Sequence, residues 1–236
     1  GAIDWISISP GGDYVVVDYS DTEQGRYHGV EVYDRNLDFL WNYPAGAGHS
    51  DLGYDADGAQ ILIKDYYDPE RNTKTIRKYR LSDGSFTDLL EFSIEFDLHV
   101  SLRNFNRPGR CFISTFDDVS RLTDDEASWL PFEDEVFALR TDGSGAVERI
   151  AHHHSRRFSP ETPDPDNSVY WAEPHATVNK AGTKVIWGSN WRRNMDQVTS
   201  VDVYLCDFSQ YLSVDDNRSD QMIEFQVYPN PATDYI

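Results

Sequence analysis

The chain is poor in basic residues and in cysteine. Its 236 residues include 21 Lys or Arg against 41 Asp or Glu, a formal net charge of -20. A surface of this sign repels a phosphate backbone, so the composition excludes nucleic acid as a partner. The 2 cysteines, Cys111 and Cys206, are too few for a disulfide framework. Each lies in an apolar, strand-like run, which favours two separate buried thiols over one disulfide.

Long apolar runs and helical patterns are also missing. The sequence has no run of 18 or more apolar residues, which predicts that it contains no transmembrane segment. The one helical candidate is DDEASWL at 124–130, whose acidic start suits a helix N-terminus inside a long loop. Aromatic residues, in contrast, make up 14% of the chain, with 14 Tyr, 12 Phe and 6 Trp. That is enough apolar area for a packed core and excludes a disordered acidic polymer.

A repeat organises the sequence. Four times a strand-like run reaches a tight turn with glycine and returns as a second apolar strand: WISISPGGDYVVV, HSDLGYDADGAQILI, HVSLRNFNRPGRCFI and HATVNKAGTKVIW. The turn glycines are Gly12, Gly58, Gly109 and Gly182, which lie 46, 51 and 73 residues apart. A third strand follows each hairpin, and a fourth strand follows in the first three repeats. This pattern predicts an all-β fold, a β-propeller with blades of four-stranded antiparallel sheet.

The number of repeats predicts a partial ring. Residues 1–208 give three complete blades and a fourth with three strands, followed by a polar linker at 209–223. An open arc of about four blades leaves two strand edges exposed, which proteins usually avoid. We therefore expect this chain to be a fragment of a larger ring that lacks blades on the N-terminal side. The alternative is a ring of four blades, closed by the strand MIEFQV that begins at Met222.

The hairpin turns support a family resemblance. SPGG at 9–12 and DADG at 55–58 fit the SPDG turn of the TolB-like or WD40-like propeller repeats of secreted bacterial proteins, and NRPG and NKAG fit it less closely. The first 208 residues resemble those repeats. The resemblance implies architecture and says little about function, because one fold hosts many activities.

The last residues resemble an export signal. The segment FQVYPNPATDYI, 225–236, is similar to the opening strand of the C-terminal sorting domain of the type IX secretion system. The matching positions are Tyr228, Pro229, Asn230, Pro231, Ala232 and Asp234. The resemblance implies that 224–236 is the truncated start of that domain and that the type IX secretion machinery is a partner. It also implies a protein that is secreted, or held at the outer-membrane cell surface of a Gram-negative bacterium.

Histidines and carboxylates recur on the strands that should line the central channel. The first strand of each blade faces the channel with alternate residues. Counting back from the turn glycines places them in successive rings, namely His49, His99 and Glu173, then Asp51, Ser101 and His175, then Arg103. Imidazole and carboxylate groups of this kind bind divalent metal ions, so the sequence indicates a metal ion in the central channel as a cofactor. The candidate ligands are His49, Asp51, His99, Glu173 and His175. The alternative is a polar network that holds water.

Two further groups are candidates for ligand binding. Trp171 and Trp191 have rings that stack on sugars, and Arg192 and Arg193 have guanidinium groups that bind carboxylates. Ordinary packing between blades and charge compensation are the alternatives. The tract His152-His153-His154 has two side chains on one face of a strand, so they can reach the same mouth of the channel, although loop histidines usually have no function.

These residues predict a binding protein, with an enzyme as the alternative. The first hypothesis is an exported β-propeller that binds an extracellular glycan or protein through its channel mouth and top loops. The alternative is a metal-dependent enzyme that acts on acidic oligosaccharides, because the layout is similar to that of oligogalacturonate lyases. By that resemblance, His99 or His175 is the candidate for the catalytic base, and the metal ion or Arg103 is the candidate for neutralising the substrate carboxylate. No stretch of the sequence matches the full ligand set of that family.

Overall fold

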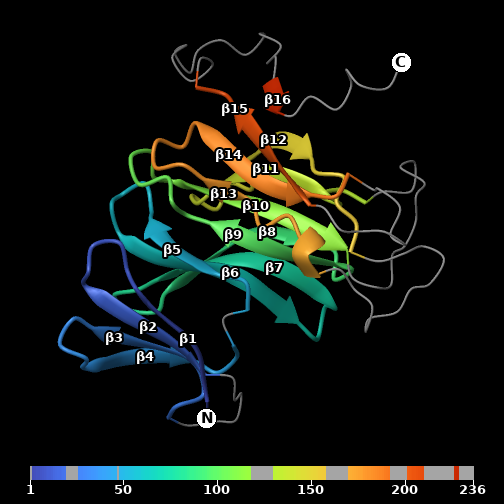
Figure 1. Cartoon of the computed structure of the whole chain (residues 1–236). Coiled ribbons are helices and arrows are strands. Elements are labelled where there is room, and N and C mark those ends of the chain that lie inside the picture. The colour runs from blue at the N-terminus through green and yellow to red at the C-terminus, as the bar shows by residue number, and fades with distance from the viewer. Residues whose placement is uncertain are drawn as a thin grey trace, which may run out of the picture.

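Four antiparallel sheets of four strands each form the structure, a computed structural model that describes residues 2–19, 26–46, 48–117, 130–157, 170–191, 201–209 and 226–228. We call the sheets blades 1 to 4 in chain order. Figure 1 shows them one after another from the blue to the red end of the chain, with blades 1 and 4 at opposite ends of the stack. The predicted fold class, a partial β-propeller of about four blades, is confirmed.

Each blade follows the chain from its first strand to its last. Blade 1 contains β1 (Ile3–Ile8), β2 (Tyr14–Tyr19), β3 (Gly29–Asp34) and β4 (Phe39–Tyr43). Blade 2 contains β5 (Asp51–Tyr54), β6 (Gln60–Asp68), β7 (Thr73–Arg80) and β8 (Phe86–Phe92). Blade 3 contains β9 (Phe96–Ser101), β10 (Arg110–Asp117), β11 (Glu135–Arg140) and β12 (Val147–His152). Blade 4 contains β13 (Thr177–Val178), β14 (Lys184–Ser189), β15 (Asp202–Asp207) and β16 (Gln226–Tyr228).

The repeated glycines close the first hairpin of every blade. Gly12, Gly58, Gly109 and Gly182 have φ angles of 72°, 83°, 85° and 67°. A side chain on Cβ disfavours this left-handed backbone, so glycine is the residue that the turn requires. In blade 2, for example, the amide of Gly58 donates to the carbonyl of Asp55 at 2.9 Å. The tight turn therefore fixes which residues of the first strand face the channel.

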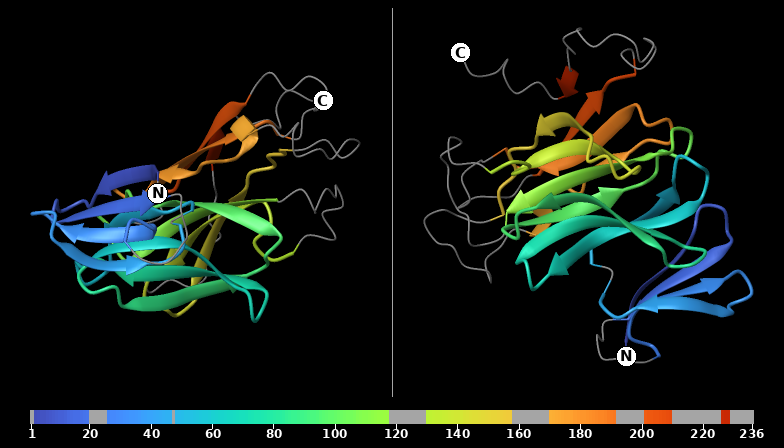
Figure 2. Two further views of the ribbon diagram at one scale, coloured as in Figure 1. Left: turned by 90° about the horizontal axis from the view of Figure 1, so that it is seen from below. Right: turned by 180° about the vertical axis from the view of Figure 1, so that it is seen from behind.

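Apolar side chains between the blades form the core, in three clusters that each join two neighbouring blades. Val16 and Val32 of blade 1 pack with Leu62 of blade 2. Ile61 and Ile63, on the other face of blade 2, pack with residues of blade 3 that include Cys111 and Phe137. Phe112 and Val136 of blade 3 pack with residues of blade 4 that include Trp187, Tyr204 and Cys206. The second view in Figure 2 shows the same succession of sheets from behind.

Several expectations for individual segments can now be compared with the structure. Cys111 and Cys206 are free, buried thiols in two different clusters, so the expectation of separate thiols is confirmed. The helical candidate at 124–130 lies outside the described residues except for Leu130. The described helical element is a 3₁₀ turn, η3 (Tyr170–Ala172). No helix in the described ranges is long and apolar enough to cross a membrane.

The prediction of only three strands for blade 4 was wrong. Gln226–Tyr228 forms β16, which pairs antiparallel with β15 and gives blade 4 its fourth strand. The sequence indicates this strand only through the alternative MIEFQV, which begins at Met222, because 18 residues, most of them polar, separate β16 from β15 and because its apolar run continues into YPNPATD. Residues 229–236 and most of the linker at 209–223 lie outside the described residues. The assignment of 224–236 to the start of a sorting domain stays a prediction.

A candidate metal centre between blades 3 and 4

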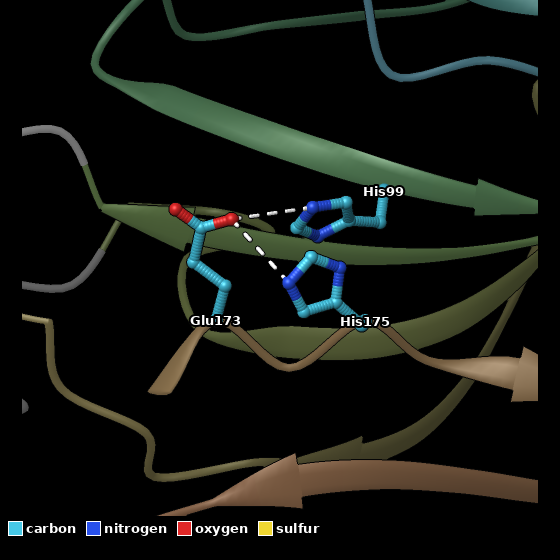
Figure 3. A group of neighbouring side chains, drawn as sticks. All are labelled: His99, Glu173 and His175. Carbon is cyan, nitrogen blue, oxygen red and sulfur yellow. Dashed lines mark ion pairs between the residues drawn. The ribbon is translucent and has the colours of Figure 1, made fainter. Parts of the chain in front are cut away.

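Two histidines and a glutamate converge where blade 4 meets blade 3. His99 lies on β9, whereas Glu173 and His175 lie on the segment between η3 and β13. The Oε2 atom of Glu173 is 3.3 Å from Nε2 of His99 and 3.6 Å from Nε2 of His175. One ligand atom from each of the three residues lies within 4.8 Å of the others. Figure 3 shows the carboxylate facing both imidazole rings.

Hydrogen bonds from blade 3 side chains hold the blade 4 segment in place. The amide of Ala176 donates to Oγ of Ser114 at 3.1 Å, and the amide of Val178 donates to Oγ of Ser101 at 3.3 Å. On the other side, the amide of Gly188 in β14 donates to the carbonyl of Pro174 at 2.8 Å. These bonds lie on both sides of His175 in the sequence. The short inner strand β13 is thereby fixed against β9, which carries His99.

The backbone of His175 is strained. Its φ angle is 43°, in the left-handed region that residues with a Cβ atom rarely adopt. Backbone strain of this kind costs free energy and persists where the surroundings enforce it, most often at functional sites. The strained conformation places the imidazole beside Glu173 and His99, whose ring centroid is 3.9 Å from that of His175.

Burial favours the neutral form of both imidazoles. It lowers the pKa of His99 from 6.5 to about 4, with the nearby His49 and His175 adding to the effect and Glu173 opposing it. Burial also lowers the pKa of His175. Neutral imidazole is the form that binds a metal ion, so these two side chains are ready to act as ligands near neutral pH.

The two oxygens of Glu173 have different partners. Arg157 lies with its Nε atom 3.0 Å from Oε1 of Glu173. Neither Oε2 of Glu173 nor either ring nitrogen of His99 makes a hydrogen bond to any residue that the structure describes. Glu173 is 3% exposed and His99 is 8% exposed. Unsatisfied polar atoms at this depth are costly, and a divalent cation coordinated by all three side chains would satisfy them.

The donor set suits a transition metal. Two imidazole nitrogens and one carboxylate oxygen form the combination that holds divalent iron, zinc, manganese or cobalt and leaves coordination positions open. Calcium and magnesium prefer oxygen ligands and fit this set less well. The ligand atoms of these three residues therefore fit a transition-metal ion better than calcium or magnesium.

The other two predicted metal ligands lie beside this cluster rather than in it. The ring of His49 is 4.3 Å, centroid to centroid, from the ring of His99. Asp51 accepts hydrogen bonds from the amides of Leu52 at 2.9 Å and Leu102 at 2.8 Å, and it pairs with Arg103. The cluster of ligand atoms that the structure brings together thus contains three of the five predicted residues, His99, Glu173 and His175.

His99 also lines a pocket. It has a volume of about 360 Å³ and is lined by inner strands of blades 1 to 3, with side chains that include Trp5, His49, Asp51, His99 and Arg103. The channel-facing positions that the repeat predicted are therefore neighbours in space. His99 belongs to both the metal cluster and the wall of this pocket.

The predicted ligand-binding residues have different surroundings. Trp171, on η3 and two residues before Glu173, is 77% exposed, which suits a stacking surface. Trp191 stacks on Tyr204 with ring centroids 5.0 Å apart and also contacts the ring of His154. That packing matches the alternative interpretation, in which the tryptophan fills space between strands. Arg192 and Arg193 lie outside the described residues.

The histidines at 152–154 contact neighbouring parts of the fold rather than the metal cluster. His153 is completely buried, and its Nε2 atom is 2.6 Å from the carbonyl oxygen of Thr115. The rings of His152 and His154 are 6.3 Å apart, as expected for two residues on the same face.

The pairing of Arg157 with Glu173 was not predicted from the sequence. Arg157 lies at the start of a long polar segment of the sequence, and no pattern there indicates a partner for its side chain.

No family model and no curated protein matches the chain. Similar solved structures include TolB from Acinetobacter baumannii, with 10% identity, a TM-score of 0.48, and coverage of 88% of this chain and 41% of that one. Oligogalacturonate lyase from Vibrio parahaemolyticus has 12% identity, a TM-score of 0.49, and coverage of 83% and 46%. Prolyl oligopeptidase B from Galerina marginata has 10% identity, a TM-score of 0.52, and coverage of 96% and 27%.

The chain thus spans less than half the length of each of these proteins. At 10% identity the third likeness, the one with a TM-score above 0.5, shows the fold alone. These likenesses therefore assign no activity to the residues of the metal cluster.

Proposed function

We propose that this chain is part of an exported β-propeller that holds a divalent transition-metal ion on His99, Glu173 and His175 and binds an extracellular ligand beside it. The observation that carries this proposal is the meeting of these three side chains, in which the buried ligand atoms of His99 and Glu173 make no hydrogen bond to any described residue. Three ligands from the protein leave positions on the ion for water or for a group of the ligand. The adjoining pocket, whose wall includes His99, would receive that ligand.

Metal titration of the purified protein tests this proposal. After treatment with a chelator, zinc, manganese and iron(II) should each be titrated by calorimetry, and the bound metal counted by elemental analysis. We expect one transition-metal ion per chain and loss of binding in His99→Ala, Glu173→Gln and His175→Ala. His152→Ala is the matched control, because that histidine lies on β12, outside the cluster of ligand atoms. Unchanged metal binding in the three site variants would overturn the proposal.

Export rests on the C-terminal sequence. The match of 225–236 to the start of a type IX sorting domain supports passage through that secretion machinery. The test is to express the complete protein in a bacterium that has the type IX system and to delete the C-terminal sorting region. We expect the deleted form to remain inside the outer membrane. Equal secretion of both forms would contradict the proposed export route.

The ligand is a glycan or a protein that reaches the channel mouth. Trp171 supports this part of the proposal, because an indole ring that is 77% exposed next to a buried metal ligand offers a flat surface for stacking. A glycan array and a pull-down with outer-membrane extracts would separate the two classes. Trp171→Ala should weaken binding on whichever of the two assays gives a signal.

A second candidate is a metal-dependent lyase for acidic oligosaccharides. It is favoured by one observation, namely that His49, His99 and Arg103 line the same pocket. His99 and His175, the two histidines predicted as the base, both belong to the metal cluster, so in this candidate the imidazole of His49 would accept the proton. The guanidinium of Arg103 would neutralise a carboxylate. A bound metal ion would supply Lewis-acid stabilisation of developing negative charge. Formation of unsaturated products, measured by ultraviolet absorbance on acidic polysaccharides, tests this activity.

A further inference from the structure

One oxygen of Glu173 is turned away from the two imidazoles and toward an arginine. Figure 3 shows Oε2 directed at His99 and His175, with the second oxygen on the far side of the carboxylate. The Nε atom of Arg157 lies 3.0 Å from that second oxygen, Oε1. The side chain of Glu173 is 3% exposed and that of Arg157 is 21% exposed. Solvent therefore screens this ion pair only weakly.

The arginine is held by both neighbouring blades. Its guanidinium carbon lies 5.1 Å from the ring centroid of Phe116 in blade 3, and that ring stacks on His99 with centroids 4.9 Å apart. Asn190 of blade 4, which is 1% exposed, fixes the adjoining backbone. Its Oδ1 atom accepts from the amide of Arg156 at 3.0 Å, and its Nδ2 atom donates to the carbonyl of Arg156 at 2.7 Å. The guanidinium is thus a fixed part of the site.

We infer that Arg157 determines which metal ion the site prefers, because it leaves Glu173 a single oxygen for coordination. Ions that prefer oxygen ligands, such as manganese(II) and calcium, gain from a carboxylate that coordinates through both of its oxygens. Zinc accepts imidazole ligands readily and needs one carboxylate oxygen here. An arginine at Oε1 keeps that oxygen from the ion and offsets part of the negative charge. The site then favours zinc over manganese(II).

The negative charge of the cluster comes from one side chain. The ligand group that the structure describes contains a single carboxylate, that of Glu173. Asp51, the other carboxylate predicted as a ligand, accepts from the amides of Leu52 and Leu102 instead. How strongly the cluster attracts an oxygen-preferring ion therefore depends on how Glu173 is paired. The inference rests on the proposed metal site and adds the residue that sets its selectivity.

Titration of the whole chain with zinc and with manganese(II) measures this preference. The ratio of the two dissociation constants, manganese over zinc, should fall at least about tenfold in Arg157→Gln, because Glu173 can then coordinate through both oxygens. Arg157→Lys should keep the ratio within about threefold of wild type, since an ammonium group also pairs with Oε1. Asn190→Ser should lower the ratio by a smaller factor, because it releases the backbone beside Arg157 without removing a charge.

Arg149→Gln is the matched control for these variants. Arg149 also pairs with a buried glutamate, Glu135, and its guanidinium carbon lies 4.9 Å from the ring centroid of Phe132. These three residues lie outside the described cluster of ligand atoms, so the ratio should equal that of wild type.

The outcomes separate this inference from the proposed metal site. If wild type binds neither ion, the metal site itself is wrong and the role of Arg157 falls with it. If zinc binds but the ratio is unchanged in Arg157→Gln, or in Asn190→Ser should that variant alone fold, the inference about Arg157 fails by itself. An equal fall of the ratio in Arg149→Gln would also overturn it, because any lost arginine would then have the same effect.

Discussion

Two carboxylates are buried between blades, and the structure satisfies them differently. Asp55, at the turn of blade 2, is 6% exposed and Glu173, beside blade 4, is 3% exposed. Asp55 is fully paired, with Nζ of Lys78 at 2.6 Å from one oxygen and Oγ1 of Thr141 donating to the other at 2.6 Å. Glu173 pairs with Arg157 through one oxygen, and its other oxygen faces two neutral imidazoles.

The difference distinguishes a group that joins two blades from the proposed metal site. Lys78 also donates to the carbonyl of Thr141, so the Asp55 group ties blade 2 to blade 3. Between blades 3 and 4, in contrast, Oε2 of Glu173 and the ring nitrogens of His99 face one another without a hydrogen bond to any described residue. A protein gains nothing in stability from such an arrangement unless another species completes it. The contrast therefore favours a bound ion at Glu173 and none at Asp55.

Removing the cation from the paired group should have the largest effect on stability. Lys78→Met leaves Asp55 buried without its partner, and we expect a loss of about 3 to 5 kcal/mol in the free energy of unfolding. Glu173→Gln, in the chelated protein, should change it by no more than about 1 kcal/mol, because the existing arrangement is already unfavourable. Urea unfolding of both variants at neutral pH measures the difference. Equal losses would remove the distinction between the two groups.

Acid should weaken the protein through the Glu173 group. Burial lowers the pKa of His99 from 6.5 to about 4, so its ring binds a proton less readily in the folded chain than in the unfolded chain. Stability that is present above pH 6.5 is therefore lost as the pH falls toward 4. For the chelated protein the loss at pH 5 should be on the order of 2 kcal/mol.

Urea unfolding at a series of pH values, with wild type and His99→Gln in parallel, measures this dependence. The variant should show a flatter profile between pH 6.5 and 4 than wild type does. If both profiles fall equally, other groups cause the acid sensitivity and the neutral state of His99 is not its source.

The fold followed from the sequence because its repeat is local. A turn glycine with positive φ, between two alternating apolar strands, needs only neighbouring residues, and all four such turns formed as predicted. The period of two along each strand then placed His49, His99 and Arg103 on the same channel side. The outer strand of blade 4 was predicted only as an alternative, because its pairing joins Leu205 to Tyr228 across a long polar segment that has no pattern of its own.

The site was predicted less completely, because it depends on contacts between blades. Counting along strands put Asp51 in the same ring as His175, yet Asp51 bonds to the amide of Leu102 and pairs with Arg103. Strand periodicity gives the direction of a side chain but not its partner on the next blade. The pairing of Arg157 with Glu173 is another such contact, and so is the left-handed backbone of His175.

The smallest effect is expected for a surface pair on the same strand as Lys78. Arg80 lies two residues further along β7 and pairs with Asp57 of the same turn, with Nη2 at 2.7 Å from Oδ2. Its side chain is 38% exposed and that of Asp57 is 55% exposed, so water screens the pair. Arg80→Ala should therefore cost no more than about 1 kcal/mol in urea unfolding. A cost as large as that of Lys78→Met would show that the turn itself, rather than the burial of Asp55, determines how strongly blades 2 and 3 are joined.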